Sequence, residues 1–281
     1  MVWILPESEI DRLIFEDAPG GDLTTAAMAI GEQHGRLALR ARDAMVLAGV
    51  EVAARMMERV GLQARIETRS GARLEPGAPV LSATGSAAAL HRVWKSAKNL
   101  MESLSGIATA TRAMVDAVEA VAPDVRIALT RKTFPGSRVL SQLAAMAGGG
   151  IVHRAGLSET ILIFAEHRAF LRDEPLHALA ARMRRAAPER KIEIEVGSVA
   201  EALEAIDAGF DAIQLEKFAP AGMAAVVAHA RSRQRPPLIA AAGGITPENA
   251  AQCVSTGIGL VVTSWPYAAR PRDLATEFQP V

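Results

Sequence analysis

Residues 192–216 read I-E-I-E-V-G-S-V-A-E-A-L-E-A-I-D-A-G-F-D-A-I-Q-L-E, and this stretch decides the fold. The short apolar runs 192–196 and 212–215 indicate buried strands. Between them, Ser198 and Glu201 have the spacing of a capping box, which predicts a helix over 198–208. A strand, a helix and a second strand in this order predict a βα unit whose strands lie parallel.

The same alternation runs from residue 126 to residue 263. The predicted strands are 126–130, 161–164, 192–196, 212–215, 238–242 and 259–263, and the predicted helices are 137–147, 175–187, 198–208, 220–231 and 247–256. Thr246-Pro247 supports the last helix, because proline is favoured in a first helical turn. Six or seven such units predict a closed or nearly closed parallel barrel. An open, doubly wound sheet is the alternative.

The first 85 residues show a different pattern. Strand patterns over 36–42, 65–69 and 80–84 mix with helical patterns over 8–15 and 50–60, without βαβ order. This mixture predicts an α+β region. A long amphipathic helix then starts near Ser86, and we expect a kink at Ser105-Gly106, where two domains would meet.

Composition narrows the function classes. Lys+Arg and Asp+Glu both number 31 in 281 residues, so the net charge of zero argues against nucleic acid or an anionic membrane as the main partner. The single cysteine, Cys253, leaves no internal disulfide and no cysteine-based zinc site. The first residues, M-V-W-I-L-P-E-S-E, lack the pattern of a signal peptide, and no apolar run reaches the roughly 18 residues of a membrane helix. We therefore expect a cytoplasmic protein.

Cationic side chains follow the first predicted barrel strand. Arg131 and Lys132 come directly after it, and His153-Arg154 follow the triple glycine 148–150. In parallel barrels the chemistry gathers at the carboxyl ends of the strands. Neighbouring cations are costly to crowd together unless an anion lies between them. The stretch therefore predicts an anion site rather than a solvated surface pair.

Two carboxylates occupy other strand ends. Alternation places Glu193 and Glu195 on the interior face of their strand, and Glu216 ends the next strand. A buried carboxylate needs a partner. Glu195 and Glu216 suit Mg²⁺ and ribose hydroxyls, since Mg²⁺ takes few carboxylates together with phosphate and water. Pairing of these carboxylates with Arg131 or Arg154 is the structural alternative.

The last two strand ends predict a phosphate cup. Gly243-Gly244 leads into a helix, where free backbone N–H groups and the helix dipole favour an anion. Thr263 and Ser264 add hydroxyls at the neighbouring strand. Phosphate bound after the last strands is a recurrent use of such barrels. A plain tight turn is the alternative for the glycine pair.

With these residues in place, the chain resembles the quinolinate phosphoribosyltransferase family over almost its whole length. The matching motifs are Gly21-Asp22-Leu23-Thr24-Thr25, Asn99-Leu100, Leu104-Ser-Gly-Ile-Ala-Thr-Ala-Thr111, Thr130-Arg-Lys-Thr133, Pro135-Gly136 with Arg138, Gly148-Gly-Gly150, His153-Arg154, Gly156-Leu157, Glu195-Val196 and Gly243-Gly244-Ile245. Their order and spacing make the resemblance specific.

The resemblance implies an α/β fold with an N-terminal α/β sandwich, residues 1–109, joined to an incomplete six- or seven-stranded α/β barrel, residues 110–265. The tail 266–281 is expected to return to the sandwich. Members of the family work as homodimers or larger assemblies with shared active sites. They are pentosyltransferases that join a pyridine dicarboxylate to phosphoribosyl pyrophosphate with Mg²⁺, releasing pyrophosphate and carbon dioxide.

The resemblance also implies roles for individual residues. The implied catalytic residues are Lys132, Glu195 and Glu216, with Mg²⁺ near the two carboxylates; the implied substrate-binding residues are Lys95, Arg131, His153, Arg154 and His167; and the implied phosphate-binding residues are Gly243, Gly244, Thr263 and Ser264. Lys95 is the residue expected to reach a neighbouring subunit's site.

The chain departs from the family pattern at several of these positions. It has Lys95 in place of an arginine, Gln142 and Phe164 in place of lysines, Glu216 in place of an aspartate and Ala242 in place of a serine. These departures resemble the ModD-like branch of the family, which is associated with molybdenum-transport operons. We therefore expect a phosphoribosyl pyrophosphate donor and a small-molecule acceptor less anionic than quinolinate. A true quinolinate enzyme of NAD synthesis and a non-catalytic anion sensor are the alternatives.

Overall fold

The computed structural model describes residues 5–171 and 173–281, which form two compact units. The first unit comprises the N-terminal residues up to Arg112, Phe134–Gly149 and Pro266–Val281. The second comprises Ala113–Thr133 and Gly150–Trp265. The expected boundary between the sandwich domain and the barrel domain, at residues 109 and 110, stays a prediction. No helix in the described ranges is both long and apolar enough to cross a membrane.

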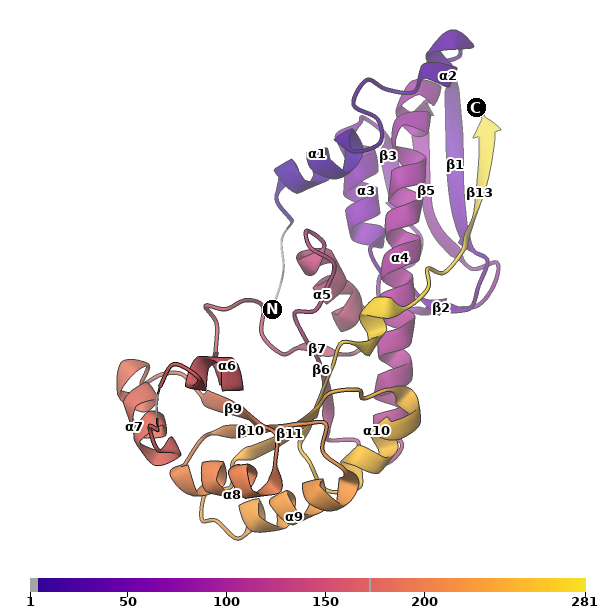
Figure 1. Cartoon of the computed structure of the whole chain (residues 1–281). Helices are drawn as coiled ribbons and strands as arrows, with labels where there is room; N and C mark the ends of the chain where they lie inside the picture. Colours follow the sequence, from indigo (N-terminus) through magenta and orange to yellow (C-terminus); the bar gives the residue numbers. More distant parts are fainter. Residues whose placement is uncertain (1–4, 172) are drawn as a thin grey trace. The chain divides into compact units, whose positions relative to one another are not determined.

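The first unit is built on a four-stranded antiparallel sheet with the order β13-β1-β5-β3 (Figure 1). Its elements are α1 (Glu7–Phe15), α2 (Leu23–Ala27), β1 (His34–Ala41), β2 (Met45–Val46), α3 (Val50–Arg59), β3 (Gln63–Ile66), β4 (Arg73–Leu74), β5 (Pro79–Ser86), the first part of α4 (Ala87–Glu119), α5 (Arg138–Ala147) and β13 (Leu274–Pro280). Helix α3 packs against β3 and β5. The α+β prediction is confirmed, although α5, expected among the barrel helices, contributes Leu140 and Ala144 to this unit's core.

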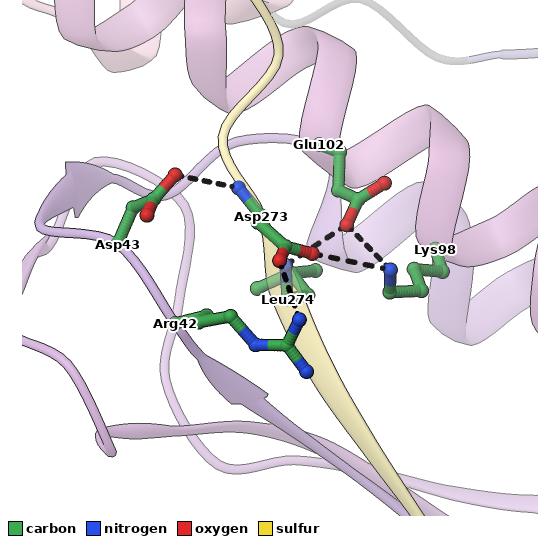
Figure 2. A network of polar contacts seen from close by, with 6 residues as sticks. All are labelled: Arg42, Asp43, Lys98, Glu102, Asp273 and Leu274. Carbon is green, nitrogen blue, oxygen red and sulfur yellow. Dashed lines mark hydrogen bonds and ion pairs between the residues drawn. The ribbon is translucent and has the colours of Figure 1, made fainter.

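Charged side chains hold the C-terminal strand of the first unit (Figure 2). The Asp273 carboxylate lies 2.8 Å from Nη1 of Arg42 and 3.4 Å from Nζ of Lys98. Lys98 also lies 2.7 Å from Glu102, whose carboxylate accepts the N–H of Leu274 at 2.9 Å. This network fixes the start of β13 beside the long helix, while main-chain pairing with β1 fixes the rest.

The Ser105-Gly106 pair has a packing role, and the kink expected there stays a prediction. Helix α4 continues through it without interruption. A Cβ atom at Gly106 would lie 2.3 Å from the carbonyl oxygen of Arg270, so only glycine lets the C-terminal segment pass this close. The Ser105 hydroxyl meanwhile accepts the N–H of Ala48 at 3.0 Å.

The second unit contains a seven-stranded parallel sheet with the order β7-β6-β12-β11-β10-β9-β8. Its elements, beyond the end of α4, are β6 (Arg126–Leu129), β7 (Ile151–Val152), β8 (Ile161–Ile163), α6 (Ala165–Arg168), α7 (Leu176–Ala186), β9 (Ile192–Val196), α8 (Val199–Ala208), β10 (Ala212–Glu216), α9 (Pro220–Arg231), β11 (Leu238–Ala242), α10 (Pro247–Val254), β12 (Leu260–Thr263) and the start of the 3₁₀ helix η1 (Trp265–Ala268). Helices α7–α10 pack against strands β9–β12 (Figure 1).

The strand order decides between the two predicted folds. Strands β8 to β12 follow one another in space as they do in sequence, so every crossover moves in the same direction. A doubly wound sheet would reverse direction at a switch point, so that alternative is wrong. Strands β7 and β8 lie at the two ends of the order. The prediction of an α/β fold with an N-terminal sandwich and an incomplete barrel is therefore confirmed.

Candidate active site

A cavity of about 640 Å³ lies at the carboxyl ends of the strands in the second unit. The predicted site residues that line it are Arg131, Lys132, His153, Arg154, Glu195, Glu216, Gly243, Gly244, Thr263 and Ser264. These residues come from six strand ends that are far apart in the sequence. The parallel sheet brings them to one edge, although their individual roles stay predictions.

Small side chains make room for the cavity. In a parallel sheet, residues in register on neighbouring strands point to the same face. Ala242 is in register with Glu216 on one side and Val262 on the other, and Val262 pairs in turn with Ala128. A buried cluster on the inner face consists of Ala128, Ala240, Ala242 and Val262. Because alanine methyl groups occupy little volume, they leave space for the cavity beside the polar residues.

One side of the cavity is cationic. Within the described ranges, no ion pair joins Arg131, Lys132 or Arg154 to a carboxylate. Arg154 is only 6% exposed, and its burial, followed by the charge of Arg131, lowers the pKa of its guanidinium. The guanidinium carbon lies 5.5 Å from the centre of the Phe164 ring, a cation–π distance. A buried guanidinium without an ion pair is costly unless it meets an anion, so this side is built to receive one.

The neighbouring His153 does have a partner. Its Nε2 lies 3.2 Å from the carboxylate of Glu193, and both side chains are largely buried. The backbone N–H of His153 donates to the carbonyl of Leu129 at 3.0 Å. Glu193 therefore holds the imidazole in place below the cationic side of the cavity.

The same cavity carries the two predicted carboxylates. Glu195 accepts a hydrogen bond of 2.5 Å from the side-chain amide of Gln214. Burial, above all, raises the pKa of Glu195, and the nearby Glu216 raises it further. Glu216 lies 3.8 Å from Nζ of Lys217. Neither carboxylate pairs with Arg131 or Arg154 in the part of the chain that the structure describes, so the structural alternative for them is wrong.

These carboxylates fit the magnesium that the family implies. Mg²⁺ usually takes one or two carboxylates and keeps water or substrate phosphate as its other ligands. Across residues 5–171 and 173–281, no three His, Cys, Asp or Glu side chains gather as a complete metal site. Glu195 and Glu216 on neighbouring strands therefore suit an ion that arrives with a phosphate-bearing ligand, not an ion held by protein alone.

The loop after β11 has the form of a phosphate cup. Among the described residues, the backbone N–H groups of Gly244 and Ile245 have no hydrogen-bond partner. Asn249 fixes the loop, since its amide donates to the Gly244 carbonyl at 3.0 Å and accepts the Thr246 N–H at 2.9 Å. Gly243 has a φ of 86°, and a Cβ there would lie 2.7 Å from Oε1 of Glu216. The geometry supports an anion-binding loop at the start of α10.

The two predicted hydroxyls differ in their surroundings. The Thr263 hydroxyl donates to the Ile245 carbonyl at 2.8 Å and accepts the Trp265 N–H at 3.1 Å, so it supports the loop from below. Ser264 lines the cavity. Of this pair, Ser264 is the better placed to contact a ligand.

Three further residues lie outside the lining of this cavity. His167 accepts the Phe164 N–H at 3.0 Å, and its ring stacks on Phe164 at 5.7 Å, so it caps α6. Lys95 belongs to the first unit, where its Nζ lies 5.4 Å from the centre of the Trp94 ring. Gln142 is buried in the same unit. The substrate-binding roles of Lys95 and His167 stay predictions.

The sequence analysis missed two polar side chains of the cavity wall, Gln214 and Glu166. Gln214 was detectable, because it is the single amide inside the apolar run A-I-Q-L-E and alternation places it on the same face as Glu216. Glu166 belongs to the one-turn helix α6, which is too short to show a periodic pattern.

Comparison with known proteins identifies the family. Residues 22–105 match the quinolinate phosphoribosyl transferase N-terminal domain, and residues 107–277 match the C-terminal domain of the same enzyme. The chain belongs to the quinolinate phosphoribosyltransferase family.

Some relatives within this family are named ModD, and others are named nicotinate-nucleotide pyrophosphorylase. A protein of Rhodobacter capsulatus described as a pyrophosphorylase, ModD, is 47% identical over 250 residues, which cover 89% of this chain and 96% of the relative. The nicotinate-nucleotide pyrophosphorylase (carboxylating) of Mycobacterium leprae is 35% identical over 279 residues, which cover 95% of each chain. The structure of NadC from Streptococcus pyogenes superimposes with a TM-score of 0.88 at 26% identity over the whole of both chains. The expected relation to ModD-named proteins is confirmed.

The cationic side of the cavity generates a first prediction. Lys132 lines the cavity and lacks an ion pair in the described ranges, so it is free to bind an anion. We expect Lys132→Ala to weaken the binding of inorganic pyrophosphate about tenfold or more in calorimetry, because a hydrogen bond to a charged group contributes about 1.5–3 kcal/mol. Lys191→Ala is the control, since this exposed lysine precedes β9 at the amino end of the sheet. Equal affinities for Lys132→Ala and the wild type would remove Lys132 from the site.

Proposed function

We propose that this protein is a phosphoribosyltransferase that uses phosphoribosyl pyrophosphate and a small-molecule acceptor less anionic than quinolinate. The observation that carries the proposal is the division of one cavity into three chemically different parts. Unpaired cations lie on one side, two carboxylates lie on another, and a loop with free N–H groups lies at the start of α10.

The chemistry of phosphoribosyl transfer matches these three parts. The bond between the anomeric carbon and the pyrophosphate oxygen breaks, its electron pair leaves with pyrophosphate, and a nucleophilic atom of the acceptor bonds to the anomeric carbon. Positive charge therefore builds on the ribose while negative charge builds on the leaving group. Arg131, Lys132 and Arg154 would stabilise the pyrophosphate, and Glu195 and Glu216 would face the ribose. The loop at Gly243-Gly244 would hold the 5′-phosphate.

Magnesium is part of the proposal. Mg²⁺ held near Glu195 and Glu216 would neutralise charge on the pyrophosphate when it is bound. The residues of the chain supply the rest: they orient the donor and exclude water. A link of this activity to molybdenum transport, implied by the ModD-like pattern, is an expectation that the gene neighbourhood tests.

The acceptor is proposed from the residue at the end of β8. Phe164 lines the cavity at a position where the family pattern has a lysine. Its ring contacts Arg154 and His167, so it also orders the wall of the cavity. An aromatic ring cannot pair with a second carboxylate. We therefore propose an acceptor with fewer negative charges than a pyridine dicarboxylate and an apolar or aromatic edge toward Phe164.

A second candidate is the carboxylating reaction on quinolinate in NAD synthesis. The Mycobacterium leprae relative, which covers 95% of this chain, has the name of that enzyme and so favours it. A third candidate, from another class, is an anion sensor that binds the donor without turnover. The experiments below separate the three.

The first test of the function is isotope exchange between pyrophosphate and the donor. We expect the wild type with Mg²⁺ to bind phosphoribosyl pyrophosphate and to exchange labelled pyrophosphate into it. The pyrophosphate released when the bond to the anomeric carbon breaks can leave the site, and labelled pyrophosphate can form that bond in its place. Glu195→Gln keeps the size of the side chain and removes the carboxylate, so we expect it to bind donor but to exchange far more slowly. Binding without exchange in the wild type would favour the sensor.

The second test concerns the assembly. We propose at least a homodimer with shared sites, in which Lys95 completes the partner's cavity by family analogy. Light scattering of the wild type at assay concentration should give twice the chain mass of 29.7 kDa or more. Lys95→Ala should keep that mass but bind the donor or the acceptor less tightly. A monomer with full ligand binding would contradict the shared site.

The third test concerns quinolinate. We expect wild-type turnover with quinolinate to stay below about 1 s⁻¹, a modest rate for an enzyme on its own substrate. A cation missing opposite a buried carboxylate costs about 2–5 kcal/mol, which is roughly thirtyfold to a few thousandfold in affinity. Phe164→Lys should bind quinolinate more tightly than the wild type, whereas Phe164→Leu, which changes shape without adding charge, should not. Efficient wild-type turnover would instead support the NAD-pathway function.

A further inference from the structure

Gln214 is a polar residue in an otherwise apolar stretch of β10. It is in register with Glu195 on β9 and Ala240 on β11, so its side chain lies on the inner face of the sheet. The residue is 4% exposed and forms part of the cavity wall. Its position inside the barrel leaves it almost fully buried.

Only half of its amide group is used. The Nε2 atom donates to Oε2 of Glu195 at 2.5 Å, while Oε1 is buried and has no partner in the part of the chain that the structure describes. An ionised carboxylate can only accept hydrogen bonds, so the NH₂ group must face Glu195 and the carbonyl must face away from it. The neighbouring Ala240 offers no side-chain donor. A buried carbonyl without a partner destabilises a fold.

The other half of the amide acts on Glu195. Gln214 is the single hydrogen-bond donor to the Glu195 carboxylate within residues 5–171 and 173–281. Glu166 and Glu216 line the same cavity and repel that carboxylate, while Lys132 attracts it from the cationic side. Without a donor, the side chain of Glu195 has no contact that selects one orientation.

We propose that Gln214 is a positioning residue, whose amide N–H fixes the Glu195 carboxylate toward the cavity at the expense of its own unsatisfied carbonyl. The inference rests on the proposed function in one respect, namely that Glu195 faces the ribose of the donor during transfer. The arrangement of Gln214 and Glu195 itself does not depend on which acceptor is used.

Three variants separate positioning from packing. Gln214→Met keeps the length of the side chain and removes both the N–H donor and the unsatisfied carbonyl. Gln214→Glu keeps the shape and replaces the donor with a second carboxylate. Ile213→Met is the matched control, because Ile213 is fully buried on the opposite face of the same strand.

The kinetic and stability readouts should diverge. We expect Gln214→Met to unfold at the same or a higher denaturant concentration than the wild type, yet to exchange pyrophosphate with phosphoribosyl pyrophosphate about ten- to a hundredfold more slowly at saturation. Donor affinity should stay within about threefold, because Glu195 acts on charge that develops only during transfer. Gln214→Glu should be slower still, and Ile213→Met should stay within about threefold. Exchange by Gln214→Met at the wild-type rate would overturn the proposal, as would an equal loss in Ile213→Met.

A structural readout is independent of activity. In crystals of Gln214→Met we expect the Glu195 carboxylate to move or to occupy several conformers, whereas Ile213→Met should leave it in its wild-type place. An unmoved Glu195 in Gln214→Met would overturn the positioning role. A moved Glu195 in a protein whose wild type neither binds nor exchanges the donor would support the positioning role and reject the proposed function.

Discussion

The buried guanidinium of Arg154 without an ion pair is the constraint on which the candidate site depends. Burial and the charge of Arg131 lower the pKa of the Arg154 guanidinium, and the charge of Glu193 raises it. Glu193 is paired with His153, however, and no ion pair joins Arg154 to a carboxylate within the described ranges. A protein that needed only stability would pair these charges or replace them. Leaving them unpaired makes sense when an anionic ligand completes the site. The phosphate-rich donor of the family's reaction is such a ligand.

Keeping the cations free requires that nearby carboxylates be held elsewhere. Glu195 is bound by Gln214, Glu193 by His153, and Glu216 lies against Gly243 beside Lys217. Each carboxylate therefore has a local neighbour that keeps it from collapsing onto the arginines. Cations left without ion pairs cost stability in the free protein. Charged groups held in energetically unfavourable surroundings are typical of functional sites.

Family membership and the departures from its pattern concern different parts of the molecule. The scaffold that collects the strand ends is shared with NadC structures, as the superposition over the whole chain shows. Phe164, by contrast, stands at a cavity wall where it contacts Arg154 and His167. An aromatic ring at this position presents no charge to the cavity. Family membership therefore supports the class of reaction, and the proposal about the acceptor rests on the side chains that line the cavity.

The sequence by itself determined the alternation of strands and helices, the parallel direction of the strands and the cluster of cations at strand ends, while the strand order in space chose the barrel over the doubly wound sheet. These follow from local periodicity and from the rule that parallel strands end at one edge. Only the tertiary structure decided that the Thr263 hydroxyl supports the loop, that Gln214 binds Glu195 and that α5 packs into the core of the first unit. It also added β7 and α6, which are too short to produce a pattern. The physical reason is that a hydrogen bond or a packing contact depends on which residues are neighbours in space. Strand register and the path by which the chain returns to an earlier element set those neighbours. No local stretch of sequence encodes either of them.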